Sequence, residues 1–424
     1  MNALEHIKNK LTEGKPLRIV FLNDIGFGAG AGIALKRQVC SFLKYGHHVV
    51  LIHGIRHIEN DLSDSFEPDL PGNWMGSDDF QDLVKSKSLS EKQKSRKIVE
   101  KVAEYEPDLV ITGNFHGARM PADILLGLRK KGMVVISYFH DCYWFTGHCA
   151  YYGDCSQYLI GCSATCPRPK DYPPLEPHKI NQAWRERREV FTGPLAIPCA
   201  VNSRWLLNRA QEAFAGKADI SLLPLGVDTS IFCPTDKKAA RKAMGIPENG
   251  RYVLMGSFDI TETRKNHHLT LHIIETLRHQ GVDVIAFGKG SENLQGVLGQ
   301  GYVSDTRQMA RIFNAADIFL STSVEEAFGQ TLLEAAACRT PIVAIDSGGV
   351  SDIARQEQNA LLVNESDPAK IYTQLNRLIE DPLLCRRMGA ASRIIAEKEF
   401  SLDRQYLNWR DYLFSLIRKY QNEK

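Results

Sequence analysis

Short apolar runs alternate with longer amphipathic segments along this chain, and the alternation stops and restarts once. In the first half, the apolar runs lie at residues 17–22, 46–52, 108–112, 133–138 and 200–203. After residues 224–228 they resume at 252–255, 284–287, 318–320 and 342–345. Strands separated by helices predict parallel sheets with helices on both faces. The sequence therefore predicts an α/β protein with two Rossmann-like domains, in which ligands bind at the carboxyl ends of the strands.

Length and composition agree with two globular domains. A chain of 424 residues is too long for one ordinary core. Its net charge of +2 gives no overall field that would indicate a nucleic-acid partner. No apolar run approaches the roughly 20 residues that cross a bilayer, and the start has no signal-peptide core. We therefore expect a cytoplasmic protein.

Two glutamates near the start of one predicted helix suggest a ligand. Glu326 follows the apolar run 318–320 in a loop, and Glu334 lies on the helix that begins at 329–331. The unbonded N–H groups and the positive dipole end of this helix point to the same loop. A phosphate at these amides with a polyol on each side would satisfy the arrangement. Such a ligand is a sugar nucleotide.

Residues 321–345 resemble the donor site of retaining GT-B glycosyltransferases of family 4, the glycosyl transferases group 1. Other segments resemble the family in the same order, with Leu225 standing where Asn is usual. These segments are 224–232, 287–290, 301–305, 315–317 and 347–349. The resemblance implies the GT-B fold, which has two Rossmann-like domains and a donor/acceptor cleft between them.

The resemblance also implies the domain limits. Residues 1–225 would form an acceptor-side domain that includes a cysteine-rich loop at 142–167. Residues 226–400 would bind the nucleotide sugar, and 401–424 would be a helix that packs back on the first domain. Residues 56–98 are polar and irregular, which predicts an insertion with helical parts.

The implied activity is retaining transfer of a sugar from a nucleotide-diphosphate sugar, linked to uridine or guanosine, to a glycan or lipid-linked glycan in cell-surface polysaccharide synthesis. Glu334 would bind the ribose, Glu326 the sugar, and helix-start amides the phosphates. The donor-binding residues in this domain are Arg264, Lys265, Phe328, Gly329, Gln330, Thr331 and Glu334.

The phosphate-binding cations depart from the family pattern. Ser257 stands where Arg is usual, and Asn266 replaces the Gly that usually follows Lys265. Arg264 offers a planar donor that suits phosphate and could supply the missing charge. Ser257 leaves open a non-catalytic subunit that binds sugar nucleotides, and a nucleotide-sugar epimerase of the same fold is a further alternative.

A glycine-rich loop follows the first predicted strand. Gly28, Gly30 and Gly32 let backbone approach a ligand closely. Ile33 occupies the third glycine position of a dinucleotide fingerprint, which disfavours an NAD enzyme. The resemblance instead places these glycines near the donor phosphates and the acceptor.

His140 and Asp141 follow the strand that ends at Tyr138. The resemblance places His140 against the donor sugar, with Asp141 beside it, and these two with Glu326 are the predicted catalytic residues. Retaining transfer by front-side attack, in which the leaving phosphate oxygen accepts the acceptor's proton, depends on positioning and charge stabilisation. It requires no cofactor.

Five of the ten cysteines lie within residues 142–166. Four of them, in a loop with glycine and proline, are candidate ligands of a tetrahedral structural zinc: Cys149, Cys155, Cys162 and Cys166. Their spacing is not that of a standard zinc knuckle, so an iron–sulfur cluster, unligated thiols and disulfides remain alternatives. Similar segments occur in a subgroup of family 4 linked to exopolysaccharide and lipopolysaccharide assembly.

Two basic clusters, at residues 94–97 and 184–188, have two interpretations. Most such runs are solvated helix faces. In an acceptor-side domain they could instead meet an anionic lipid-linked acceptor, which would bring the protein to the inner surface of the cell membrane.

Overall fold

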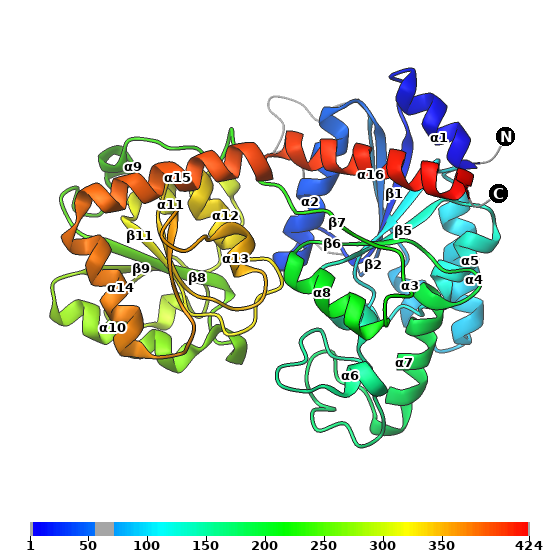
Figure 1. Ribbon diagram of the computed structural model, residues 1–424, viewed down its shortest axis with the longest axis horizontal. Coiled ribbons are helices and arrows are strands. Elements are labelled where there is room, and N and C mark those ends of the chain that lie inside the picture. Colours follow the sequence, from blue (N-terminus) through cyan, green and yellow to red (C-terminus); the bar gives the residue numbers. More distant parts are fainter. Residues whose placement is uncertain (1–2, 56–71, 423–424) are drawn as a thin grey trace. The chain divides into compact units, whose positions relative to one another are not determined.

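The computed structural model describes residues 3–55 and 72–422, which form two compact units (Figure 1). Unit 1 comprises Met1–Pro224 and Gln405–Lys424, and unit 2 comprises Leu225–Arg404. Each unit is built around one sheet in which all paired strands are parallel.

The sheet of unit 1 has the order β3-β2-β1-β4-β5-β6-β7. Its strands are β1 (Arg18–Ile25), β2 (His48–Ile55), β3 (Trp74–Asp79), β4 (Leu109–Thr112), β5 (Val135–Phe139), β6 (Cys199–Val201) and β7 (Ile220–Leu222). The central strands are buried on both faces, which explains their continuous apolar sequences. The order reverses between β1 and β4, so their carboxyl ends form the switch point where such sheets bind ligands.

Helices and loops cover this sheet. They are α1 (Ala3–Thr12), α2 (Ala29–Lys44), α3 (Gln81–Lys85), α4 (Glu91–Ala103), α5 (Asp123–Lys130), η1 (Tyr143–Phe145), α6 (Gln157–Ile160), α7 (Pro177–Thr192) and α8 (Arg204–Ala213). Sequence chemistry defines some of their ends: Ser90 and Gln93 form a reciprocal capping box at the start of α4. In Figure 1, α6 and its loops lie at one edge of unit 1, next to α7.

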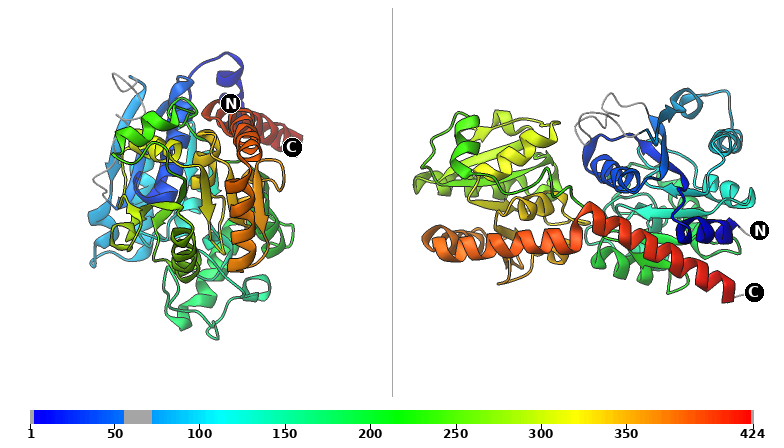
Figure 2. Two further views of the ribbon diagram at one scale, coloured as in Figure 1. Left: turned by 90° about the vertical axis from the view of Figure 1, so that its left-hand side faces the viewer. Right: turned by 90° about the horizontal axis from the view of Figure 1, so that it is seen from above.

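The last helix, α16 (Leu402–Asn422), packs on unit 1 from residue 405 onward. The hydroxyl of Tyr406 lies 2.9 Å from Nε2 of His47, whose Nδ1 accepts the N–H of Leu17 at 3.0 Å. The end of α16 lies beside α1 (Figure 2), where Gln421 donates to Glu5. Polar and aromatic contacts therefore join the two ends of the chain to one sheet.

The sheet of unit 2 has the order β10-β9-β8-β11-β12-β13. Its strands are β8 (Tyr252–Asp259), β9 (Asp283–Lys289), β10 (Leu298–Gly299), β11 (Ile318–Ser321), β12 (Ile342–Ile345) and β13 (Ala360–Val363). The helices around it are α9 (Lys237–Ala243), η2 (Thr263–Lys265), α10 (His267–His279), η3 (Ser291–Asn293), α11 (Thr306–Ala315), α12 (Gln330–Ala337), α13 (Val350–Ile353), α14 (Pro368–Glu380) and α15 (Pro382–Phe400). Here the switch point lies between β8 and β11.

Each apolar run of the sequence overlaps a strand, so the predicted fold class of two Rossmann-like domains is confirmed. Four strands were not predicted: β3, β7, β10 and β13. The prediction of an irregular insertion at 56–98 was wrong at β3, which is a strand although its sequence is mostly polar. Residues 56–71 of that predicted insertion lie outside the described part of the chain. Within residues 3–55 and 72–422, no helix has the length and apolar character that crossing a membrane requires.

Candidate functional site

The predicted donor-site residues of unit 2 centre on a partly buried ion pair. Nζ of Lys265, in η2, donates to Oε2 of Glu326 at 2.6 Å, and a guanidinium nitrogen of Arg264 lies 3.8 Å from the same oxygen. Burial alone would raise the pKa of Glu326, but Lys265, Arg264 and the N–H of Phe328 outweigh it and lower that pKa. Glu326 is therefore a carboxylate held by two cations.

Backbone contacts hold η2 against the loop that follows β11. The hydroxyl of Thr322 donates to the carbonyl of Lys265 at 2.9 Å, and the N–H of Val324 donates to the carbonyl of Arg264 at 2.9 Å. The two segments are far apart in sequence, so the ion pair depends on the sheet that brings β8 and β11 together.

A glycine pair after β12 packs against the other side of Glu326. The N–H of Gly349 donates to the carbonyl of Glu326 at 2.7 Å. Gly348 has φ +61°, and a Cβ on it would lie 2.0 Å from the same carbonyl oxygen. Only glycine fits this approach, which explains the glycine at 348.

Helix α12 begins beside this loop. Its N-cap, Gly329, has φ +95°, and Phe328 before it is buried against Phe400. Gln330 and Thr331 form the first turn, and Glu334 follows on the same helix with 6% of its surface exposed. The structure thus brings Lys265, Arg264 and Glu326 to the loop from which this helix starts.

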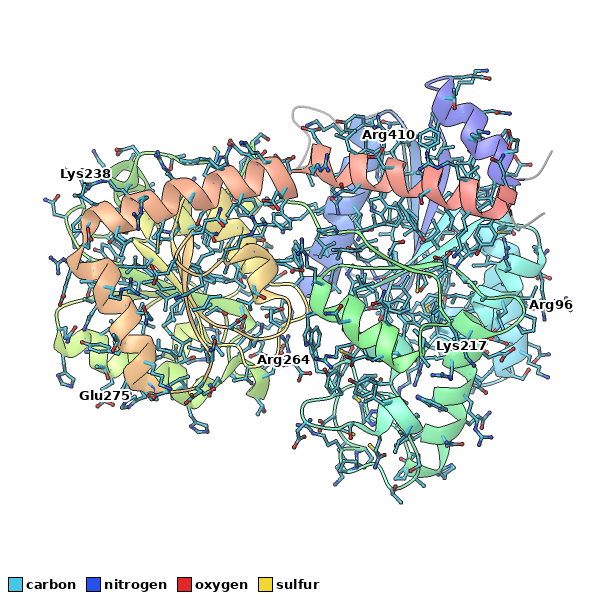
Figure 3. All side chains as sticks on the ribbon, viewed as in Figure 1. Arg96, Lys217, Lys238, Arg264, Glu275 and Arg410 are labelled. Carbon is cyan, nitrogen blue, oxygen red and sulfur yellow. The ribbon has the colours of Figure 1, made fainter. Side chains whose placement is uncertain are left out.

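The position of the missing cation is filled by a small polar side chain. Ser257 is nearly buried, and its hydroxyl donates to the carbonyl of Asp259 at 2.9 Å. A cavity of about 30 Å³ beside it is lined by Ser257, Lys265 and Thr322, among others, and has room for a water molecule. The side chain of Arg264 (Figure 3) bonds Glu262 at 2.8 Å, so the nearby positive charge comes from η2.

The glycine-rich loop of unit 1 lies where β1 leads into α2. Gly28 is the N-cap of α2, and the other two glycines lie in its first turn. A Cβ on Gly32 would lie 2.6 Å from the carbonyl oxygen of Gly26, whereas a Cβ on Gly30 would meet nothing within 4 Å. Gly32 is thus required for packing, and the space beside Gly30 is open.

Asp141, at the carboxyl end of β5, is the centre of a buried polar network. Its Oδ2 accepts from Nε2 of His116 at 3.0 Å and from Nδ2 of Asn114 at 3.1 Å, and its Oδ1 accepts the N–H of Tyr143 at 2.9 Å. Burial would raise the pKa of Asp141, but His116 and these hydrogen bonds outweigh burial and lower it. Asp141 is therefore ionised although it is nearly buried.

His116 joins Asp141 to two further groups. Its Nδ1 lies 3.2 Å from the hydroxyl of Tyr172 and 3.9 Å from Oδ2 of Asp24. Burial lowers the pKa of His116, yet Asp141 and Asp24 more than compensate, so the pKa is raised. Asp24 itself is buried at the end of β1, which raises its pKa.

His140 lies next to this network but has a different electrostatic character. It is nearly buried, and burial lowers its pKa to about 4. A neutral imidazole there is consistent with a hydrogen-bonding role rather than that of a cation.

Sequence reasoning found His140 and Asp141 but missed His116, Asn114, Asp24 and Tyr172. Asn114 and His116 follow the run 108–112 as His140 and Asp141 follow 133–138, so strand-end position was an available signal. No local pattern marks Tyr172, which reaches His116 from the segment just after the cysteine-rich loop.

The four predicted cysteine ligands lie in the loops around α6 as free thiols. Sγ of Cys162 accepts the N–H of Gly147 at 3.1 Å, and burial raises the pKa of Cys149 to about 12. Nε2 of His148 lies 3.6 Å from Sγ of Cys166. Among the described residues, no three His, Cys, Asp or Glu side chains are arranged to hold a metal ion. The zinc site therefore stays a prediction.

Comparison with known proteins supports a family for unit 2. The model of the family "Glycosyl transferases group 1" matches residues 250–381. A D-inositol 3-phosphate glycosyltransferase of Acidothermus cellulolyticus is 29% identical over 187 residues, 39% of this chain and 41% of the relative. A GDP-mannose-dependent monoacylated alpha-(1-6)-phosphatidylinositol monomannoside mannosyltransferase of Corynebacterium glutamicum is 30% identical over 228 residues, 47% of this chain and 57% of the relative. The chain spans about half the length of the curated relatives it matches.

Solved structures are similar over most of the chain. HepE of Anabaena in complex with UDP aligns with a TM-score of 0.69 and 18% identity, and the alignment covers 94% of this chain and 100% of HepE. WaaG, a glycosyltransferase involved in lipopolysaccharide biosynthesis, aligns with TM-score 0.65 and 16% identity, covering 93% of this chain and 99% of that one. Such identities establish the fold alone. Residues 250–381 thus form a glycosyl transferases group 1 domain, in a chain that has the GT-B fold.

Proposed function

We propose that this chain is a retaining glycosyltransferase that uses a nucleotide-diphosphate sugar as its donor. The observation that carries the proposal is the Lys265–Glu326 ion pair, with Arg264 beside it, where α12 begins in the group 1 domain. Two cations close to helix-start amides suit a diphosphate. HepE, which has the same fold, is known in complexes with UDP and with UDP-glucose.

Each donor-site residue then has a role. Lys265 and Arg264 bind the diphosphate, with the amides of residues 328–331 completing the anion site. Glu326 exchanges its bonds to these cations for contacts with the sugar, and Glu334 binds the ribose hydroxyls. In unit 1, Gly28 and Gly30 let the backbone approach the phosphates, and the neutral His140 donates a hydrogen bond to the sugar.

The acceptor in this proposal is a glycan or a lipid-linked glycan, and the process is cell-surface polysaccharide synthesis. The support is the resemblance of the cysteine-rich segment to those of polysaccharide-assembly enzymes, together with two relatives' names. One relative acts on inositol 3-phosphate and the other on a phosphatidylinositol mannoside. A lipid-linked acceptor would bring unit 1 to the inner membrane surface, where the basic residues 184–188 would meet anionic headgroups.

The test is donor binding and turnover by the purified full chain with a panel of UDP- and GDP-sugars. We expect one donor to bind and to be hydrolysed slowly to the free nucleotide without an acceptor. Analysis of the sugar product separates transfer from epimerisation. Binding without any turnover would favour the non-catalytic alternative, and no binding to any donor would contradict the proposal.

We also propose that the cysteine-rich segment holds one structural Zn²⁺, and that His148 is among its ligands. Nδ1 of His148 donates to the carbonyl of Pro173 at 2.9 Å, so the lone pair of Nε2 faces Cys166. Zn–S and Zn–N bonds of about 2.3 and 2.0 Å at a tetrahedral angle place two ligand atoms roughly 3.6 Å apart. That agrees with the 3.6 Å between Nε2 of His148 and Sγ of Cys166. Other thiols must turn to complete the set.

Metal analysis of the full chain tests this second proposal. We expect about one zinc per chain, lost in Cys162→Ser and kept in Cys385→Ser, a control in unit 2 whose thiol is partly buried. Iron in place of zinc would favour a cluster. A chain purified with neither metal would contradict a metal site.

A further inference from the structure

Tyr172 connects the surface of unit 1 to its buried polar network. The residue is 61% exposed, yet its hydroxyl lies 3.2 Å from Nδ1 of the buried His116. A Cβ on Gly117 would lie 3.6 Å from that hydroxyl and 2.8 Å from Oδ2 of Asp24. The phenol therefore ends at the carboxyl edge of the sheet, over a backbone position that leaves space for it.

The direction of the hydrogen bonds follows from Asp141. A carboxylate only accepts, so Nε2 of His116 carries a proton and donates to Asp141. Asp141 and Asp24 raise the pKa of His116, and in the protonated imidazole Nδ1–H donates to the oxygen of Tyr172. Within the described residues, the hydroxyl hydrogen of Tyr172 then has no acceptor and is available to a ligand.

The network contains another polar atom that lacks a partner. Asn114 is 3% exposed and donates to Asp141, but its Oδ1 has no hydrogen-bond partner within the described residues. Buried polar groups are rarely left unsatisfied unless a water or a ligand completes them. The strand ends of β1, β4 and β5 thus combine a fixed hydroxyl donor with an unfilled acceptor.

We propose that Tyr172, held by the Asp141–His116 pair, is an acceptor-positioning residue that hydrogen-bonds a hydroxyl of the sugar acceptor. An exposed aromatic ring that ends in a fixed hydroxyl offers both an apolar face and a polar tip, and a sugar has matching surfaces. The inference rests on the proposed glycosyltransferase function. It also gives a role to the segment just after the cysteine-rich loop, because Tyr172 lies there and reaches the sheet edge.

Tyr172→Phe removes the hydroxyl and keeps the ring. The matched control is Tyr45→Phe, since Tyr45 is 40% exposed in the same unit and stacks on Tyr406. The assay measures nucleotide release from the nucleotide sugar that the wild-type protein binds. It is run without an acceptor and then with methyl and octyl glycosides of glucose, galactose, mannose and N-acetylglucosamine. We expect Tyr172→Phe to raise the acceptor KM at least tenfold while donor hydrolysis without acceptor stays within twofold. The control variant should match wild type.

A second measurement follows the hydrogen bond itself. In ¹⁵N NMR of the full chain, Tyr172→Phe should shift Nδ1 of His116 and leave the other histidines unchanged. Three results would each overturn the inference, provided that the wild-type protein still hydrolyses the donor. They are an unaltered acceptor KM in Tyr172→Phe, an unaltered His116 signal, and a panel in which no glycoside accelerates nucleotide release by wild type. Loss of donor hydrolysis in wild type itself would instead contradict the proposed function, and the inference with it.

Discussion

The candidate donor site of unit 2 and the polar network of unit 1 occupy equivalent places in two similar sheets, but they are built differently. In unit 2, Glu326, Gly329 and Glu334 lie within one loop and one helix, to which η2 and the glycine pair after β12 are added. In unit 1, Asp24, His116, Asp141 and Tyr172 come from four separate segments. The first arrangement is visible as a motif, whereas the second exists only once the sheet has formed.

The two sites also differ in charge. In unit 2, the cations Lys265 and Arg264 pair with the carboxylates of Glu326 and Glu262, so an anionic ligand would exchange with these carboxylates for two cations. In unit 1, two aspartates enclose one histidine and leave an excess of negative charge, which suits hydroxyl donors better than phosphate. In the proposed function, the cations of unit 2 bind the diphosphate, and the polar network of unit 1 contacts hydroxyl groups.

The largest effect should come from Glu334→Ala. We expect donor binding to fall by more than a hundredfold, because a buried site that loses its bonds to the ribose hydroxyls leaves those hydroxyls unpaired. Titration of the donor by calorimetry measures the change. The control is Glu275→Ala, since Glu275 is an exposed carboxylate on α10 that lies well away from Arg264 in Figure 3. Equal losses in both variants would contradict the assigned role of Glu334.

Breaking the ion pair should destabilise unit 2 selectively. Lys265→Met leaves Glu326 mostly buried without its main partner, which should cost about 3 kcal/mol. The double variant Lys265→Met/Glu326→Gln should recover part of the stability but not the donor affinity. All five tryptophans lie in unit 1, so tryptophan fluorescence should stay unchanged while calorimetry detects the loss. A fluorescence transition that shifts equally would show that the two units unfold together.

In unit 1, Asp141→Asn removes the charge that holds His116. We expect a loss of about 2 kcal/mol, because hydrogen bonds to a charged group are replaced by weaker ones. Urea unfolding followed by tryptophan fluorescence measures this loss. Asp154→Asn is the control, since the Asp154 side chain is 98% exposed. Donor affinity should be unchanged, and a large drop in it would weaken the division of roles between the units.

The smallest effect concerns pH. Burial lowers the pKa of His47 to about 4, below its value near 6.5 in the unfolded chain. As pH falls below about 6.5 the unfolded chain binds a proton that the folded chain does not, so stability declines until about pH 4 and then levels. Between pH 7 and pH 5, the loss of unfolding free energy followed by tryptophan fluorescence should be about 1.8 kcal/mol smaller in His47→Gln than in wild type. Burial also lowers the pKa of His140 to about 4, so His140 contributes a similar loss of stability at low pH, which His47→Gln should still show.

The strands that the sequence did not predict share a position in the fold. β3, β7, β10 and β13 were not predicted, and these are the four edge strands of the two sheets. An edge strand is paired on one side only and needs less apolar sequence, so β3 reads Trp-Met-Gly-Ser-Asp-Asp. The interior strands were predicted because burial on both faces demands continuous apolar side chains.

The sequence by itself determined the fold class and the local part of the donor site. Strand and helix alternation follows from near-neighbour chemistry, and so do the loop, the glycines and the two glutamates around the start of α12. Tertiary structure alone decided which groups that are distant in sequence form ion pairs and hydrogen bonds. It set Lys265 against Glu326 across β8 and β11, and His116 between Asp141 and Tyr172. Electrostatic interactions depend on distance in space and on burial, and the spacing of residues along the chain fixes neither.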